Sequence, residues 1–439
     1  MISISGMRGV YGDGLDDALA ERFAYAFGSL YRGTTVVGRD SRKSGKAISK
    51  AVISGLTRAG NDVIDIGLAS TPTTEMAVPK RNAAGGIIIT ASHNPGEWNG
   101  LKLLGPDGVF LDGGQGKEVL ETFRATGGIG GKSPAGNVST WDSANDHHVQ
   151  SILDLDIIDG ERIAAKRYEV CIDTVNGAGG IICRDLLERL GCTIHALNAE
   201  PTGDFPHNPE PVPAHIGGLC VSVERTGADI GFAVDPDVDR LSLVSEKGTA
   251  IGEEYTLALA VDFMLGKRAT DAACNLSTSR MVDDAAARHG RKVFRSPIGE
   301  INVVKLMRKV GAGIGGEGNG GIILPALHCG RDAVLGMAMI LQFLTESGKG
   351  IGELASAYPV YHMIKDRIEL GEKGAWIGPM KEAFAGETID EQDGVKVIRE
   401  NGWVHIRESN TEPIVRIFAE ALTEDAARSL VKKVYDAIG

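Results

Sequence analysis

A serine and a histidine stand side by side in the hexapeptide Thr90–Pro95, Thr-Ala-Ser-His-Asn-Pro, directly after the apolar run Gly86–Ile89. The run predicts a buried strand, and a proline disfavours helical geometry in the residue before it. We therefore expect Ser92 and His93 on a shaped loop at the carboxyl end of a strand. A hydroxyl beside an imidazole could act in nucleophilic catalysis. The pair alone is a weak indication, but three other segments supply what such a serine would need.

Three carboxylates at alternate positions, Asp235, Asp237 and Asp239, form the second candidate segment. Pro236 predicts a loop in which these side chains can converge on one hard cation, and without a positive charge they would repel one another. Magnesium fits because it takes few protein oxygens and leaves room for a phosphate oxygen. A calcium-binding EF-hand is disfavoured, because its sixth position would be Arg240, where the sharp turn needs glycine. A solvated acidic turn remains the alternative for this segment taken alone.

Two further segments are rich in hydrogen-bonding groups. The glycine-rich stretch Gly315–Gly321 carries Glu317 and Asn319, which could bind vicinal hydroxyls of a sugar; a flexible turn with a solvated glutamate is the alternative. The stretch Arg407–Pro413 offers a guanidinium, hydroxyls and an amide, which are the groups that a phosphate dianion binds; a polar hairpin turn is the alternative. The candidate phosphate-binding residues are Arg407, Ser409, Asn410, Thr411 and Arg416.

Several isolated basic residues allow more than one interpretation. Arg8 could reach a shared site or be solvated near the terminus, and Lys102 could contact a phosphate, act as an acid or base, or lie exposed on a strand. Neighbouring residues on a helix point apart, so we interpret His147 and His148 as surface residues rather than metal ligands. We assign His207, which lies between two prolines, to a structured turn.

The elements that must position these residues follow a repeated pattern. Strand, polar turn, helix, glycine and strand follow one another over residues 35–66, 168–197 and 272–294, and each unit is followed by another apolar strand and one candidate loop. Ligand sites of open α/β sheets form outside the carboxyl ends of the strands. We therefore expect three similar mixed-sheet α/β domains and a C-terminal α+β domain around a central cleft. Their expected ranges are 1–147, 148–250, 251–364 and 365–439.

The composition restricts the partners. The formal net charge of −12 argues against nucleic acid, which binds basic surfaces. The six cysteines are dispersed and form no Cys-x-x-Cys pair, which predicts free thiols in a reducing compartment. The N-terminus shows no secretory signal, and no apolar run reaches the roughly 18 residues that a membrane span requires. We expect a cytoplasmic protein, monomeric or homodimeric, that binds a small molecule rather than nucleic acid or a membrane.

The four loops, taken together and in this order, resemble those of the α-D-phosphohexomutase superfamily, which includes phosphoglucomutases, phosphomannomutases and phosphoglucosamine mutases. The resemblance covers essentially the whole chain. It implies an isomerase that moves a phosphoryl group between positions 1 and 6 of a hexose phosphate, through a phosphoserine at Ser92 and a 1,6-bisphosphate that also acts as activator. It further implies Mg²⁺ bound by Ser92, Asp235, Asp237 and Asp239, with Glu317 and Asn319 on the sugar.

The resemblance also implies roles for the basic residues. By motif position Arg8, His93, Lys102 and Arg240 look like the basic residues of the family's active site, and which of them is the general acid or base stays open. The Arg407 stretch and Arg416 would hold the phosphate that does not react.

The sugar loop Gly-Glu-Gly-Asn-Gly-Gly departs from the pattern of many bacterial members, because Asn319 stands in place of serine and Gly321 in place of histidine. With His328 and Arg331 following, it resembles archaeal-type phosphoglucosamine mutases and phosphomannomutases. His328 could fill the place of the missing histidine or pack near it. Glucosamine phosphate is the leading expectation for the substrate, with mannose or glucose phosphate as alternatives. A sugar-phosphate phosphatase and a non-catalytic sugar-phosphate sensor are the alternatives from other classes.

Overall fold

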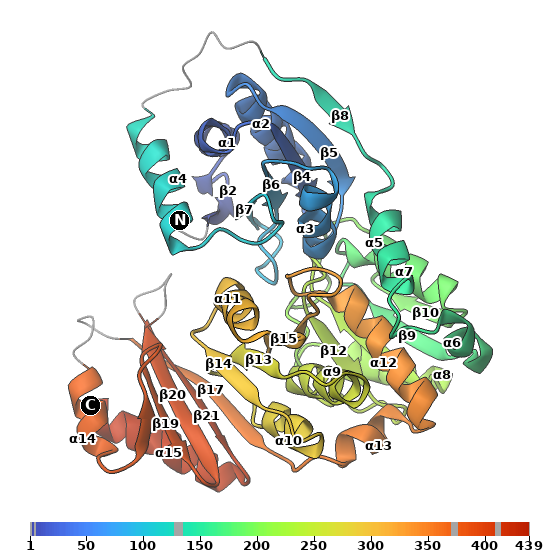
Figure 1. Ribbon diagram of the computed structural model, residues 1–439, viewed down its shortest axis with the longest axis vertical. Coiled ribbons are helices and arrows are strands. Elements are labelled where there is room, and N and C mark those ends of the chain that lie inside the picture. Colours follow the sequence, from blue (N-terminus) through green and yellow to red (C-terminus); the bar gives the residue numbers. More distant parts are fainter. Residues whose placement is uncertain (1, 4–5, 127–134, 370–375, 409–413, 439) are drawn as a thin grey trace.

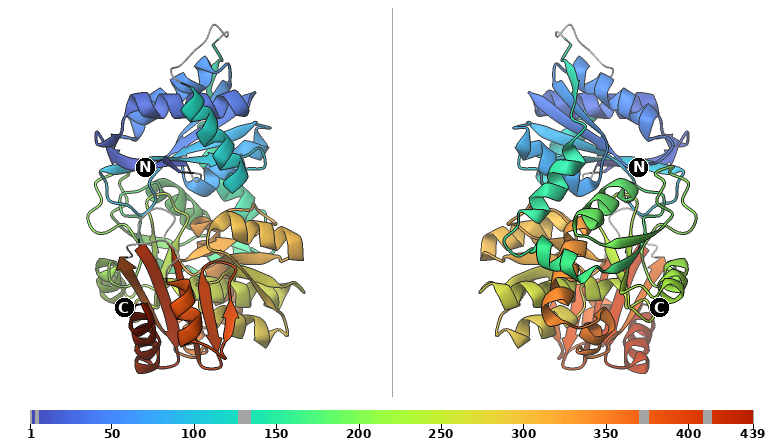
Figure 2. Two further views of the ribbon diagram at one scale, coloured as in Figure 1. Left: turned by 90° about the vertical axis from the view of Figure 1, so that its left-hand side faces the viewer. Right: turned by 90° about the vertical axis from the view of Figure 1, so that its right-hand side faces the viewer.

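The computed structural model describes residues 2–3, 6–126, 135–369, 376–408 and 414–438. Their strands form four sheets, each built from one continuous stretch of the chain, and we name the corresponding units domains I to IV. Domain I lies at the top of Figure 1 and domain IV at the lower left, and domains II and III connect them along the right-hand side and the bottom (Figures 1 and 2). No helix in the described ranges is long and apolar enough to cross a membrane.

Domain I is a mixed sheet with helices on both faces, in the strand order β1-β2-β7-β6-β4-β5-β8, with β3 beside β2. Its strands are β1 (Ile2–Ser3), β2 (Gly6–Tyr11), β3 (Gly14–Leu15), β4 (Thr34–Arg39), β5 (Asp62–Leu68), β6 (Gly85–Ile89), β7 (Trp98–Leu104) and β8 (Val138–Thr140). Its helices are α1 (Asp17–Leu30), α2 (Gly45–Arg58), α3 (Thr71–Lys80) and α4 (Gly113–Ala125). Side chains alternate along a strand, so Ile87 and Ile89 pack towards α1 and α2 while Ile88 packs towards α3.

Domains II and III repeat this plan with four strands each, in the orders β10-β9-β11-β12 and β14-β13-β15-β16. Domain II contains α5 (Ala144–Leu153), α6 (Gly160–Lys166), β9 (Glu169–Asp173), α7 (Gly179–Arg189), β10 (Thr193–Leu197), α8 (Gly217–Thr226), β11 (Ile230–Val234) and β12 (Leu241–Val244). Domain III contains α9 (Glu253–Lys267), β13 (Ala272–Asn275), α10 (Met281–Arg288), β14 (Val293–Ser296), α11 (Glu300–Val310), β15 (Ile314–Glu317), β16 (Gly321–Ile323), α12 (Ala333–Ser347) and α13 (Ile351–Ser356).

The repeated α/β unit expected from the sequence is confirmed. In each of the three domains one strand (β4, β9 or β13) pairs in parallel with the two strands that follow it in the chain, and the second of these two then turns back into an antiparallel partner. The hairpins are β6–β7, β11–β12 and β15–β16. Three of the candidate loops are therefore the same structural feature in three domains, the loop between the last parallel strand and its antiparallel partner.

Domains II and III share one hydrophobic core, whereas domains I and IV have cores of their own. The shared core is centred on α9 and α12, and almost every residue of α12 is buried. A helix that is apolar on all sides is stable only when it is covered on all sides. Domains II and III consequently form one packed unit on which the other two domains rest.

Domain IV is an antiparallel sheet in the order β17-β21-β20-β19-β18. Its elements are β17 (His362–Glu369), α14 (Ile377–Ala383), β18 (Thr388–Asp390), β19 (Val395–Arg399), β20 (Gly402–Glu408), β21 (Ile414–Ala421) and α15 (Glu424–Ile438). Val404 and Ile406 of β20 pack in a core with the two helices. The alternate residue His405 faces domain III, where its Nδ1 lies 2.8 Å from Ser277 Oγ. One face of the sheet therefore carries the helices and the other rests on domain III.

One sequence interpretation is wrong in this region. His147 and His148 both lie on α5, and His147 is partly exposed, but His148 is fully buried. Successive side chains on a helix point about 100° apart, so a pair of neighbours can place one residue in solvent and the other in the interior. His148 cannot be a surface residue, and it belongs to a polar cluster described below.

Candidate active site

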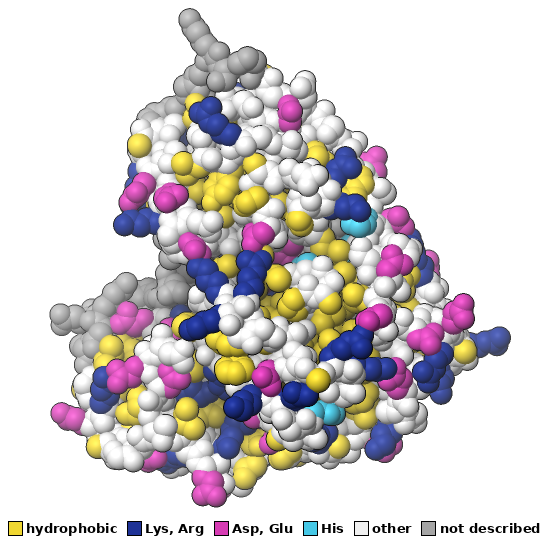
Figure 3. Space-filling view, in the orientation of Figure 1, with side chains coloured by type: hydrophobic (Ala, Val, Ile, Leu, Met, Phe, Trp, Pro, Cys, Tyr) yellow, Lys and Arg dark blue, Asp and Glu magenta, His cyan; other side chains and the backbone are white. Residues whose placement is uncertain are grey.

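The candidate loops lie around a cavity of about 830 Å³ between the domains. Expected site residues that line it are Arg8, Ser92, His93, Lys102, Arg240, Glu317, Asn319 and Arg416. In Figure 3 the surface is notched between domains I and IV, and Lys and Arg side chains gather beside the notch over α11. Lys305 and Arg308 of α11 form partly exposed ion pairs with Asp112 and Asp107 of domain I.

Ser92 is buried and its hydroxyl points at domain II. Ser92 Oγ donates to Asp235 Oδ2 at 2.8 Å, and Nδ1 of His93 lies 3.4 Å from the same hydroxyl. The backbone of Ser92 has a φ of 50°, in the left-handed region that non-glycine residues seldom adopt. Such conformations persist only where the surroundings impose them, and they are concentrated at functional sites.

The serine loop (Thr90–Pro95) is held in this shape by Arg42, which is 1% exposed. All five N–H groups of its guanidinium are used: Nε donates to Asp40 Oδ2, and the two terminal nitrogens donate to four backbone carbonyls. These carbonyls belong to Ser92, Asn94, Pro95 and Trp98, at 2.5 to 2.8 Å. Asp40 also accepts from Thr90 Oγ1 at 2.7 Å. The sequence analysis did not single out Asp40 or Arg42, which follow β4.

The metal loop (Asp235–Arg240) buries all three aspartates completely. Their ligand oxygens lie within 4.8 Å of one another, and Oδ1 of Asp237 and Oδ1 of Asp239 have no hydrogen-bond partner among the described residues. Burial, and then the charges of Asp239 and Asp237, raise the pKa of Asp235 well above its ordinary value. A cluster of hard oxygens that includes buried acceptors without hydrogen bonds fits a hard divalent cation such as Mg²⁺.

Two basic residues from different domains neutralise part of this charge. Lys102 Nζ donates to Asp237 Oδ2 at 2.6 Å and lies 3.4 Å from Asp239 Oδ2. Burial alone would lower the pKa of Lys102, but these two carboxylates outweigh it and raise that pKa above the ordinary lysine value. Arg240 Nε lies 3.7 Å from Asp239 Oδ1 and 3.9 Å from Asp235 Oδ2, and Arg240 also forms an ion pair with Glu210 at 3.1 Å. The Arg240 charge and then burial lower the pKa of the neighbouring His93 well below its ordinary value, which favours the neutral imidazole.

The sugar loop (Gly315–Gly321) is connected to the metal loop by Arg331, which the sequence analysis did not place in the site. The Arg331 guanidinium donates to Glu317 Oε2 at 2.9 Å, to Asp239 Oδ2 at 2.7 Å and to Glu300 Oε2 at 2.8 Å. The other oxygen of Glu317 accepts from Asn275 Nδ2 at 2.8 Å. The sugar and metal loops are therefore positioned by one shared cation.

His328 does not belong to this cavity. The described residues that line the cavity do not include it, and its ring nitrogens face Asp332 and Glu75 instead. His328 therefore does not take the place of the histidine that many bacterial members of the family carry in the sugar loop.

The candidate phosphate loop (Arg407–Pro413) is described only in part. Arg407 lies opposite Arg416 in the antiparallel pair of β20 and β21. The Nε of Arg407 donates to Asp393 Oδ2 at 3.0 Å. Arg416 lines the cavity, whereas Arg407 is not among the described residues that do. The expected phosphate ligands Ser409, Asn410 and Thr411 lie outside the described residues.

Comparison with known proteins agrees with this architecture. The family models of phosphoglucomutase/phosphomannomutase match the chain in order: α/β/α domain I at residues 3–127, α/β/α domain II at 146–248, α/β/α domain III at 252–361 and the C-terminal domain at 365–437. A phosphoglucomutase/phosphomannomutase of Thermococcus kodakarensis is 37% identical over 97% of this chain and 96% of its own length. A probable phosphoglucosamine mutase of Methanopyrus kandleri is 35% identical over 99% and 96%.

Solved structures give the same result. The crystal structure of a phosphoglucomutase/phosphomannomutase family protein from Burkholderia thailandensis superposes with a TM-score of 0.85 at 26% identity, over 100% of this chain and 97% of that one. The fold and the site thus define a multidomain phosphohexomutase, which is an isomerase that acts by intramolecular phosphoryl transfer. The chain belongs to the phosphoglucomutase/phosphomannomutase family.

Proposed function

We propose that this protein interconverts the 1- and 6-phosphates of glucosamine, with glucose and mannose phosphates as the alternative substrates. The observation that carries the proposal is the Ser92 hydroxyl, held at 2.8 Å on the carboxylate of Asp235 inside a cavity that also contains the sugar loop and Arg416. A nucleophile, a cation site and anion-binding groups in one cavity are what phosphoryl transfer requires.

In the proposed cycle Ser92 carries a phosphoryl group at rest. The Oγ–P bond of phosphoserine breaks as a hydroxyl oxygen of the sugar phosphate forms a new bond to phosphorus, and the proton of that hydroxyl passes to a basic group of the cavity. The resulting 1,6-bisphosphate reorients and returns its other phosphoryl group to Ser92, and the proton returns to the sugar oxygen that is released. The same bisphosphate, added from outside, phosphorylates Ser92 and so acts as the activator.

The residues of the chain bind and orient these groups. Asp235, Asp237 and Asp239 would hold Mg²⁺, which when bound neutralises charge on the transferring phosphoryl group. Lys102, Arg8 and Arg240 bring further positive charge to the same end of the cavity. The phosphate loop and Arg416 would hold the phosphate that does not react. Glu317 and Asn319 would bind sugar hydroxyls that overlap in the two orientations of the ligand.

Two observations support glucosamine as the sugar. Probable phosphoglucosamine mutases of Methanopyrus kandleri and Methanococcoides burtonii are each 35% identical to this chain, although the 37% identical relative is named phosphoglucomutase/phosphomannomutase. In addition, the carboxyl groups of Glu210, Glu254, Glu300 and Glu317 all line the cavity. A protonated amine at position 2 of the sugar donates stronger hydrogen bonds to carboxyl oxygens than a neutral hydroxyl does.

Phosphorus NMR tests the proposal. The protein with Mg²⁺ and a trace of the matching 1,6-bisphosphate is given glucosamine, glucose or mannose 1-phosphate in separate tubes. We expect the 6-phosphate to form fastest from glucosamine 1-phosphate, no conversion by Ser92→Ala, and full conversion by Ser29→Ala, a control on α1 of the same domain. Release of inorganic phosphate would indicate a phosphatase, and no reaction in any tube would indicate a sensor. Faster conversion of glucose 1-phosphate or mannose 1-phosphate would show that the proposed sugar is wrong and would leave the proposed mutase activity standing.

A further inference from the structure

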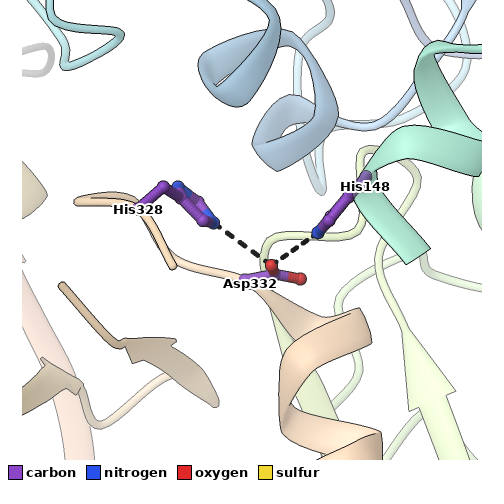
Figure 4. A group of neighbouring side chains, drawn as sticks. All are labelled: His148, His328 and Asp332. Atoms are coloured by element: carbon purple, nitrogen blue, oxygen red, sulfur yellow. Dashed lines mark hydrogen bonds and ion pairs between the residues drawn. The ribbon is translucent and has the colours of Figure 1, made fainter. Parts of the chain in front are cut away.

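Outside the cavity, two histidines and an aspartate from separate parts of the chain meet in the interior. His148 lies on α5, Asp332 is the N-cap of α12, and His328 lies in the turn that precedes it. Figure 4 shows the two imidazole rings approaching the Asp332 carboxylate from opposite sides. Asp332 Oδ2 lies 2.8 Å from His148 Nε2 and 3.1 Å from His328 Nε2. His148 and Asp332 are fully buried, and the side chain of His328 is 8% exposed.

A fourth residue, Glu75 of α3, points into this cluster without a hydrogen bond. It is 1% exposed, and neither of its carboxyl oxygens has a hydrogen-bond partner among the described residues. Its Oε2 lies 3.4 Å from Nδ1 of His328, and that nitrogen also has no hydrogen-bond partner in the described part of the chain. Unpaired buried acceptors of this kind are costly, so their presence beside one another needs an explanation.

The arrangement of protons explains why Glu75 and His328 do not form a hydrogen bond with each other. A neutral imidazole carries one proton, and a His328 that donates from Nε2 to Asp332 has only a lone pair at Nδ1, facing the oxygen of Glu75. His148 has no such conflict, because its Nδ1 lies 2.9 Å from the hydroxyl of Thr73, which can donate or accept. A positive ion at the Nε2 side of His328 would place the proton on Nδ1 and allow it to donate to Glu75.

We propose that His148, His328 and Asp332 form a binding site for one divalent transition-metal ion of the zinc type, with Glu75 and Thr73 as the residues that orient the two imidazoles. Two imidazoles and one carboxylate form a ligand set that suits zinc. The pattern carboxylate, histidine, metal is the usual environment of a ligating histidine. On binding, the proton of each imidazole would lie on Nδ1, where His328 donates to Glu75 and His148 to the hydroxyl of Thr73, and the charges of Asp332 and Glu75 would balance the charge of the ion.

The site would join parts of the protein that have separate cores. Glu75 belongs to domain I, His148 to the helix that follows that domain, and His328 and Asp332 to domain III. Oδ1 of Asp332 is already used to cap α12, where it accepts from the backbone N–H groups of Val334 and Leu335, so only Oδ2 faces the ion. We expect this ion to fasten domain I to the unit formed by domains II and III. It would be separate from the metal loop, which binds through Asp235, Asp237 and Asp239.

Calorimetric titration of chelator-treated full-length protein with Zn²⁺ tests the proposal. Saturating Mg²⁺ is present, so that the metal loop does not take up zinc. We expect one equivalent of Zn²⁺ to bind to the wild type and to His147→Gln, the control that changes the neighbouring histidine on the same helix. His328→Gln should lose this binding, and Glu75→Gln, which keeps all three ligands, should weaken it about tenfold to a hundredfold. X-ray absorption at the zinc edge should show two imidazole ligands.

A second measurement makes the test independent of the folding of any one variant. Zn²⁺ should raise the thermal unfolding midpoint of the wild type and of Asp235→Ala, but not that of His328→Gln. His148→Gln should also lose zinc binding. If this variant does not fold, the weaker zinc binding expected of Glu75→Gln, which keeps all three ligands, tests the site instead. The proposal is wrong if the wild type binds no zinc in saturating Mg²⁺, or if His328→Gln and Glu75→Gln bind zinc as the wild type does. Either result leaves the proposed mutase activity untouched, because that activity is measured with Mg²⁺ alone.

Discussion

Replacing Arg42 by lysine tests whether one guanidinium holds the nucleophile in place. Arg42 uses five N–H groups on five buried or partly buried acceptors, and a lysine ammonium has three donors. At least two acceptors therefore lose their partner, at about 1–3 kcal/mol each. We expect Arg42→Lys to lower the stability of domain I by about 2–6 kcal/mol. Turnover should fall on the order of tenfold to a hundredfold, because Ser92 would no longer be fixed against Asp235.

Urea unfolding followed by tryptophan fluorescence, together with steady-state kinetics, measures both effects. Arg58→Lys is the matched control, because Arg58 is half-exposed on α2 and its ion pair with Glu21 at 3.2 Å is reached equally well by lysine. We expect the control to change stability by less than about 0.5 kcal/mol. A loss below about 1 kcal/mol in Arg42→Lys, with unchanged turnover, would refute the reasoning, because the five hydrogen bonds would then not be what shapes the loop.

Three further variants test other parts of the structure. Lys102→Met should lower turnover by on the order of a hundredfold or more, because Asp237 of the metal loop then loses its ion pair with the Lys102 ammonium. Lys305→Met, which removes an ion pair outside the metal loop, is the control. An unchanged rate in Lys102→Met would show that Lys102 has no part in catalysis. Arg331→Lys should raise both the KM for the sugar phosphate and the Mg²⁺ concentration at half-maximal rate, because a lysine ammonium cannot reproduce the planar guanidinium that bonds to Glu317 and Asp239 together. A change in only one of these two quantities would contradict the proposal that Arg331 positions both loops. Burial lowers the pKa of Lys396 to about 7, so between pH 7 and 10 the unfolded chain binds a proton that the folded protein does not. Stability should therefore rise with pH in this window, by up to about 1.4 kcal/mol per pH unit. Thermal melts should show that Lys396→Met loses this slope and Lys381→Met, an exposed control, keeps it.

The repeated fold could be predicted from the sequence because its signals are local. Apolar strands, polar turns and glycines at helix ends recur three times, and each signal depends on residues a few positions apart. The position of Ser92 at the end of β6 follows from the same signals, since the strand and the proline on either side of the loop fix its limits. The spacing of the three aspartates likewise indicates a cation site without knowledge of the rest of the chain.

What holds the site together could not be predicted, because it depends on contacts between distant residues. Arg42 reaches carbonyls 50 to 56 positions along the chain, and Arg331 reaches a carboxylate 92 positions away. An arginine that is buried by such contacts looks the same in the sequence as one that is solvated. The error at His148 has the same origin, since local polarity does not reveal which face of α5 packs against domain III.

The order of the domains along the chain has a consequence for how the protein is made. Each sheet comes from one continuous stretch, so domain I can fold as it leaves the ribosome, whereas domains II and III, which share one core, would fold together. The cavity, in contrast, draws on residues from Arg8 to Phe418. The serine loop would thus be formed early in synthesis, and the metal loop would join it when domains II and III are complete. Domain IV, with Arg416, arrives last, so a nascent chain cannot enclose a sugar phosphate until translation is almost finished.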